Sequence, residues 1–192
     1  MIDRYAMMSF SSHLLPAALV SNGAGFVQVD ENGKYYNAAE TDAFLEAMNW
    51  VMDMVSKYEM KAPEGAEWNY FESAFINGEV ALQVHEDYFA GSLANMEDDY
   101  GFVFFPKGPR AKTYLYAPSD NIMVIPACYD ADRAWKIAFA YNLFTNPTPG
   151  YTDSDDWKNG YYQKYRDERA VDETITMMRE PEHQFVWYSD MV

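Results

Sequence analysis

The sequence has a single cysteine, Cys128, among its 192 residues. One cysteine excludes an internal disulfide and any metal cluster built from several thiolates. Because Cys128 follows Pro126 and Ala127 at the end of an apolar segment, we expect a small buried thiol rather than a reactive one.

Basic residues are also few: 14 Lys and Arg stand against 30 Asp and Glu, a formal net charge of −16. An acidic surface repels phosphate backbones and anionic lipid headgroups, which disfavours nucleic acids and membrane surfaces as partners. Hydrophobic residues make up 49% of the chain, enough for a sizeable core. The length predicts one domain, or one lobe of a larger protein.

No run of about 18 apolar residues occurs, so no transmembrane segment is predicted. The N-terminus does not resemble a secretory signal either, since Asp3 and Arg4 precede mixed residues and Pro16 interrupts the best apolar stretch. The aromatic C-terminal residues carry no terminating signal. Together these features favour a piece of a longer precursor.

Motifs for catalysis and for metal or cofactor binding are missing. The histidines, His13, His85 and His183, are far apart in sequence and have no metal-ligand spacing, so no metal site is predicted. No nucleophile elbow, phosphate-binding loop or dinucleotide fingerprint occurs, so no cofactor is predicted. Glu72 with Glu86 could serve a glycosidase, but among thirty acids some such pair can always be chosen. We therefore expect a protein that is not an enzyme.

Hydrophobic periodicity predicts helices alternating with short strands, an α/β fold. The predicted helices are 5–20 (kinked or split at Pro16), one that starts at Asn37 or Thr41 and ends before Pro63, 67–76, 87–96, 131–144 and 168–179. The predicted strands are 26–29, 34–36, 80–84, 102–105, 113–116 and 122–125. The long helix should bury a stripe formed by Phe44, Met48, Val51, Met52 and Val55, and the 131–144 helix one formed by Ala134, Ile137, Ala138, Tyr141 and Phe144.

Several landmarks appear in a characteristic order. They are the Asn22-Gly23 and Asn32-Gly33-Lys34 turns, Trp68 through Phe75-Ile76-Asn77-Gly78-Glu79-Val80-Ala81-Leu82, Tyr100-Gly101-Phe102-Val103, Pro106-Lys107-Gly108-Pro109, and Asn121 to Pro126 leading to Ala134-Trp135-Lys136. Over residues 20–180 this order resembles the extracellular solute-binding proteins of carbohydrate ABC importers.

The resemblance implies a C-terminal lobe of the type II periplasmic-binding-protein fold, with a short mixed sheet flanked by helices. Residues 1–192 would form this single lobe, and 151–192 a possible lobe-boundary segment. The implied function is non-catalytic binding of a carbohydrate, such as an oligosaccharide, between two lobes, for delivery to an ABC import permease. The resemblance implies one of two locations. The protein would be extracellular, anchored to the membrane by lipidation of the full precursor, or it would be periplasmic.

Three sets of residues are candidate ligand contacts, because sugars need flat aromatic faces and planar polar groups. Glu86, Asp87 and Tyr88 follow a predicted strand, at a junction that faces the cleft in the resembled family. The alternative is that Asp87 caps a helix and Tyr88 packs beneath it. Asp120 and Asn121 lie in a second turn, which equally fits ordinary turn chemistry. Trp157 offers a stacking face, or else packs on a partner segment.

Two other classes of protein remain open. A carbohydrate-active hydrolase would turn over aryl glycosides and lose that activity when one carboxylate is changed. A cell-surface interaction module would use its aromatic C-terminal segment to bind another protein and would not respond to sugars.

Overall fold

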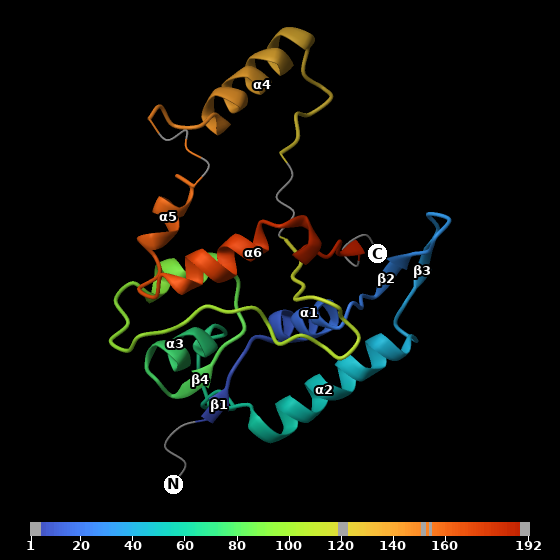
Figure 1. Cartoon of the computed structure of the whole chain (residues 1–192), viewed down its shortest axis with the longest axis vertical. Helices are drawn as coiled ribbons and strands as arrows, with labels where there is room; N and C mark the ends of the chain where they lie inside the picture. The colour runs from blue at the N-terminus through green and yellow to red at the C-terminus, as the bar shows by residue number, and fades with distance from the viewer. Residues whose placement is uncertain (1–4, 119–122, 151–152, 154, 189–192) are drawn as a thin grey trace. The chain divides into compact units, whose positions relative to one another are not determined.

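The computed structural model describes residues 5–118, 123–150, 153 and 155–188, which belong to two compact units. Unit 1 comprises 1–118 and 162–192, and unit 2 comprises 119–161. The elements of unit 1 are small sheets flanked by helices, as the α/β prediction expected (Figure 1).

Strand β1 (Tyr5–Met7) pairs in parallel with β4 (Val80–Leu82), in a register that places Tyr5 opposite Val80. The predicted helix 5–20 is therefore wrong at its start, because pairing with a strand distant in sequence satisfies this backbone: the Tyr5 N–H donates to the Glu79 carbonyl at 2.9 Å. Helix α1 spans Ser11–Ser21 and contains Pro16 without being split by it.

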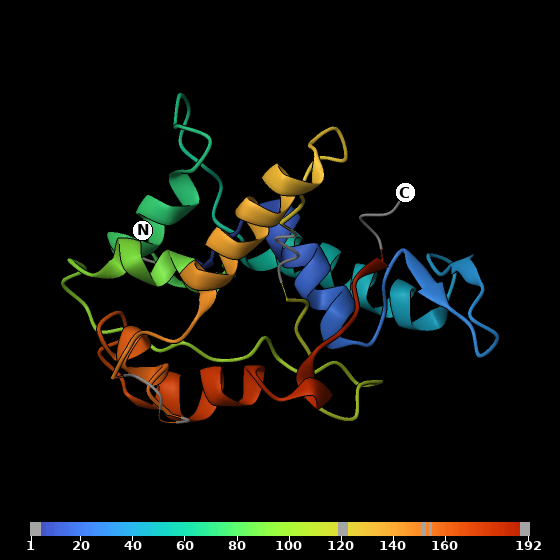
Figure 2. The ribbon, with the colours of Figure 1, turned by 90° about the horizontal axis from the view of Figure 1, so that it is seen from above.

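The predicted strands 26–29 and 34–36 are confirmed and form a hairpin, the antiparallel pair β2 (Val27–Val29) and β3 (Tyr35–Asn37). Its turn depends on Gly33, whose φ of +77° favours glycine, and on Asp30, whose carboxylate accepts hydrogen bonds from the backbone of Asn32 and Lys34. The hairpin projects at one end of unit 1 in both views (Figure 2).

Helix α2 (Asp42–Tyr58) begins after Thr41, whose hydroxyl accepts a hydrogen bond from the Phe44 N–H. Thr41, rather than Asn37, is thus the N-cap. The buried face of α2 packs on α1. The main core contains Met7, Leu14, Ala18, Leu19, Ala24, Phe44, Ala47 and Val51, with Met48 and Met54 packed against it. The predicted stripe is correct for Phe44, Met48 and Val51 but wrong for the exposed Met52 and Val55.

A second, smaller core lies beside helix α3 (Tyr70–Ile76). Helix α3 ends before Gly78, which has a φ of +69° and supplies a left-handed stop. After β4 comes a 3-10 helix, η1 (Asp87–Leu93), in place of the predicted α-helix 87–96. The residues of this core are Phe89, Leu93 and Met96, with Phe75, Ile76 and Tyr100 against them.

Residues 102–105 are extended but form no strand, contrary to prediction. Their polar groups are satisfied differently: the Thr174 hydroxyl donates to the Phe102 carbonyl at 2.9 Å. The predicted strand 113–116 is also wrong, because only Tyr116 forms a bridge, with Gln184. Of the predicted strand 122–125, residues 123–125 are not in a strand, and Ile122 lies outside the described residues.

The C-terminal part of unit 1 is helical but irregular. The predicted helix 168–179 is a π-helix, η2 (Ala170–Ile175), followed by α6 (Thr176–Met178) and the short 3-10 helix η3 (Pro181–His183). Buried Val171, Thr174 and Ile175 hold this segment in place.

Unit 2 contains helix α4 (Ala131–Thr145), which is capped by Asp130 through a 2.8 Å hydrogen bond from the Arg133 N–H. No residue of α4 is buried, so its predicted stripe does not form a core. Cys128 is exposed, which corrects the expected buried thiol: the chain around it has no packed neighbour strand. Helix α5 (Lys158–Tyr162) lies at the unit boundary. Among the described residues, no helix is long and apolar enough to cross a membrane.

Candidate functional site

Seven rings from three parts of unit 1 meet in what we call the aromatic cluster. It consists of Phe10, His13, Trp68, Phe71, His85, Tyr88 and Phe89. The parallel pairing of β1 with β4 explains the meeting, because the chain leaves both strands at the same edge of the sheet. Phe10 and His13 follow β1, and His85, Tyr88 and Phe89 follow β4. Trp68 lies just before α3, and Phe71 lies in its first turn.

Phe71 lies at the centre of this cluster and is buried. Its ring stacks on Phe10 with centroids 5.6 Å apart and on His85 at 5.9 Å. Trp68 meets the Phe10 ring edge-on at 6.2 Å and is 74% exposed. Tyr88 meets His85 edge-on at 5.4 Å and is 62% exposed. The cluster therefore has a buried base and presents two large aromatic side chains to solvent.

His85 joins the cluster to the backbone of Glu86 and to the carboxylate of Glu72. Its Nδ1 accepts a hydrogen bond from the Glu86 backbone N–H at 2.9 Å, so the ring hydrogen is on Nε2, which lies 3.4 Å from Oε1 of Glu72. His13 lies beside it, with ring centroids 4.8 Å apart. Burial, and next the nearby His13, lower the pKa of His85 below its usual value, while Glu72 and Glu86 act in the opposite direction.

This lowered pKa predicts an acid-sensitive stability. In the unfolded chain His85 takes up a proton near pH 6.5, whereas in the folded protein the lowered pKa keeps it neutral to lower pH. Acid therefore favours the unfolded state, and the free energy of unfolding should fall as the pH drops from about 7.5 to about 5.5. His85→Gln keeps a donor toward Glu72 and should show a smaller fall. Urea unfolding at both pH values measures this difference. Equal falls in the two proteins would contradict the assignment to His85.

The first set of predicted contacts lies at this cluster. Tyr88 is exposed, which rules out the alternative that it packs beneath a helix. Glu86 is exposed and occupies the N-cap position of η1, so Asp87 is not the cap. Asp87 is half-buried, and its carbonyl accepts a hydrogen bond from the Tyr165 hydroxyl at 3.3 Å.

The other predicted contacts are placed elsewhere. Asp120 and Asn121 lie outside the described residues. Trp157 belongs to unit 2, where its half-buried ring meets Tyr161 edge-on at 5.8 Å and Lys158 Nζ lies 5.9 Å from its centroid. Both contacts are local.

Sequence reasoning missed Phe10, His13 and the role of Glu72. Phe10 and His13 are some seventy residues from His85 along the chain, and no local pattern connects them. The histidines are far apart in sequence, yet His13 and His85 are in ring contact. The Phe71-Glu72 pair shortly before a strand was the available signal, but only the strand pairing shows which residues it meets.

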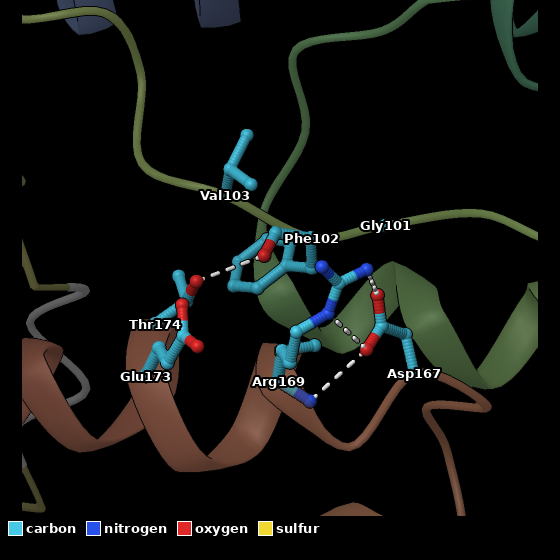
Figure 3. Close-up of a pocket in the computed structure, with 8 residues that line it drawn as sticks. Gly101, Phe102, Val103, Asp167, Arg169, Glu173 and Thr174 are labelled. Atoms are coloured by element: carbon cyan, nitrogen blue, oxygen red, sulfur yellow. Dashed lines mark hydrogen bonds and ion pairs between the residues drawn. The ribbon is translucent and has the colours of Figure 1, made fainter.

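A shallow hollow of about 200 Å³ lies elsewhere in unit 1, between residues 101–103 and η2 (Figure 3). Its cation is already engaged: Arg169 donates from Nε and Nη2 to the two carboxylate oxygens of Asp167 at 3.0 and 2.7 Å. Because Arg169 already pairs with Asp167, this hollow is a weaker candidate site than the aromatic cluster.

Known protein structures include one with a similar fold. No family model matches the sequence, and no curated protein does. Among solved structures, the chain is similar to the maltose-maltodextrin binding protein of the thermoacidophilic bacterium Alicyclobacillus acidocaldarius, with a TM-score of 0.52 and 16% identity. The match covers 97% of this chain and 49% of that one, so the chain spans about half of that protein's length. At this identity the likeness shows the fold alone.

Proposed function

We propose that this chain is one lobe of a non-catalytic carbohydrate-binding protein and that the aromatic cluster contacts the ligand. The observation that carries the proposal is the pair of exposed rings, Trp68 and Tyr88, in a cluster whose His85 lies against the Glu72 carboxylate and is followed by the exposed Glu86. The similar structure is that of a maltose-maltodextrin binding protein, which is consistent with this class of ligand.

The chemistry of the cluster suits a sugar. The C–H faces of a pyranose ring are apolar and pack on aromatic rings, whereas its hydroxyl groups pair with carboxylates. Buried Phe71 contacts the Trp68 ring, and buried Phe89 stacks on His85, which meets Tyr88, so the contact surface is held before the ligand arrives.

The wider function is part of the same proposal. The ligand would close two lobes around itself, and an import permease of the ABC type would recognise the closed form, outside the cell or in the periplasm. A ligand shifts that equilibrium only through its contacts to both lobes, so we expect one lobe alone to bind weakly.

Isothermal titration of the chain with maltotriose, cellotriose, xylotriose and a tripeptide, up to millimolar concentrations, tests the proposal. We expect saturable binding of at least one trisaccharide. Trp68→Ala and Tyr88→Ala should each weaken it by about tenfold, or 1.4 kcal/mol.

Trp135→Ala is the matched control, since Trp135 is an exposed tryptophan of unit 2 and should leave the affinity unchanged. Binding that is unaffected by Trp68→Ala and Tyr88→Ala would refute the cluster as the site. Tripeptide binding alone would refute the ligand class. Turnover of an aryl glycoside that is lost in Glu86→Gln would favour a hydrolase instead.

A further inference from the structure

Three potential metal ligands converge at η3, far in sequence from the aromatic cluster. They are Glu180, Glu182 and His183, and their ligand atoms all lie within 4.8 Å of one another. The two carboxylates are exposed, whereas the His183 side chain is only 5% exposed. A buried imidazole facing two accessible carboxylates combines a fixed ligand with an open approach from solvent.

The hydrogen bonds of His183 determine its tautomer. Nδ1 lies 2.8 Å from the Tyr114 carbonyl oxygen and 3.1 Å from the Thr113 hydroxyl. A carbonyl oxygen can only accept, so Nδ1 carries the ring hydrogen. In the neutral imidazole, the lone pair is then on Nε2, the nitrogen that faces the glutamates.

With a neutral imidazole, three acceptors point at the same space. Nε2 lies 3.5 Å from Oε2 of Glu180 and 3.5 Å from Oε1 of Glu182, and none of these contacts is among the hydrogen bonds of the described residues. A lone pair and two anionic oxygens at this range repel one another unless a cation lies between them.

We propose that Glu180, Glu182 and His183 bind a divalent transition metal ion, with Zn²⁺ the best fit. Ligand atoms at zinc distances of about 2.0–2.1 Å and tetrahedral angles are about 3.3 Å apart, close to the observed Nε2–oxygen separations. One imidazole with two carboxylates suits zinc, and the fourth position remains for water. The hydrogen bond from Nδ1 to a backbone carbonyl is the usual support of a zinc-bound histidine.

The fold holds the imidazole ready for this role. The His183 carbonyl accepts from the Tyr116 N–H at 3.0 Å, and the Phe185 N–H donates to the Tyr116 carbonyl at 2.8 Å. The ring also lies 5.7 Å from that of Phe104. A bound ion would therefore tie the exposed glutamates of η3 to the segment 113–116, which gives the site a stabilising role. The proposal does not depend on the proposed function.

Titration of the untagged, chelator-treated chain with ZnCl₂ near neutral pH, followed by calorimetry and thermal unfolding, tests the site. We expect one saturable site and a melting temperature that rises with zinc concentration. Glu180→Gln/Glu182→Gln should weaken binding at least tenfold. Because both positions are exposed, this variant should fold, whereas a change at buried His183 risks misfolding.

Two control variants test whether zinc binds at these three residues. Glu64→Gln/Glu67→Gln removes the same charge from exposed positions elsewhere and should bind zinc like the unchanged chain. His85→Gln removes one member of the His13–His85 pair, which could compete for the ion, and should also leave zinc binding intact. Absence of saturable binding would show that only a proton occupies the space. Zinc binding that survives Glu180→Gln/Glu182→Gln, or is lost in His85→Gln, would place the ion elsewhere; each result overturns the proposal.

Discussion

Replacing Phe71 by alanine should lower the free energy of unfolding by about 3–5 kcal/mol, the usual cost of removing a buried phenylalanine. Phe71 is 4% exposed and its ring contacts those of Phe10, His13, Trp68 and His85. Truncation leaves a cavity beneath the exposed aromatic side chains. It should therefore also abolish the arrangement on which the proposed sugar binding depends.

Guanidinium unfolding followed by circular dichroism measures this loss. Phe144→Ala is the matched control: Phe144 lies in α4, is 85% exposed, and should change the free energy of unfolding by less than about 0.5 kcal/mol. If the two substitutions have equal effects, the aromatic cluster is not a packed unit.

Gly108→Ala should be the second large effect, at about 1–3 kcal/mol of destabilisation. A Cβ at this position would lie 2.5 Å from Oδ1 and 2.7 Å from Cα of Asn22. Asn22 cannot easily move away, because its Nδ2 donates to the Ala43 carbonyl at 2.8 Å and its Oδ1 accepts from the Arg110 N–H at 3.1 Å. The Gly108 N–H itself donates to the Ser21 carbonyl at 2.9 Å.

Gly101→Ala provides the comparison, since a Cβ there meets no atom within 4 Å and the substitution should be nearly neutral. Thermal unfolding of both variants measures the two changes in stability. Neither glycine has a positive φ, so neither substitution strains the backbone dihedral angles. The difference in stability between the variants therefore measures the close approach of Gly108 to Asn22. Equal stability of the two variants would contradict that close approach.

The elements predicted correctly are those whose cause is local. The hairpin depends on Asn32-Gly33, the end of α3 on Gly78, and the start of α4 on Asp130, and each signal lies within a few residues of the structure it produces. The wrong elements depend on partners far along the chain. Residues 5–7 form a strand only because Val80–Leu82 pairs with them, and 102–105 form none because no described strand pairs with them.

The candidate site divides in the same way. Tyr88 and Glu86 could be proposed from the sequence, since a strand followed by polar and aromatic residues marks a ligand-holding edge. Phe10, His13 and the neighbourhood of Glu72 could not, because they reach His85 only through the β1–β4 pairing.

By itself, the sequence determined the α/β class, the long helices α2 and α4 and the hairpin, because hydrophobic periodicity and turn chemistry act locally. Only the tertiary structure decided which rings meet at His85, that Gly108 lies tightly against Asn22, and that His183 turns Nε2 toward two carboxylates. These features arise where residues distant in sequence come into contact, and the chain carries no local signal for such contacts.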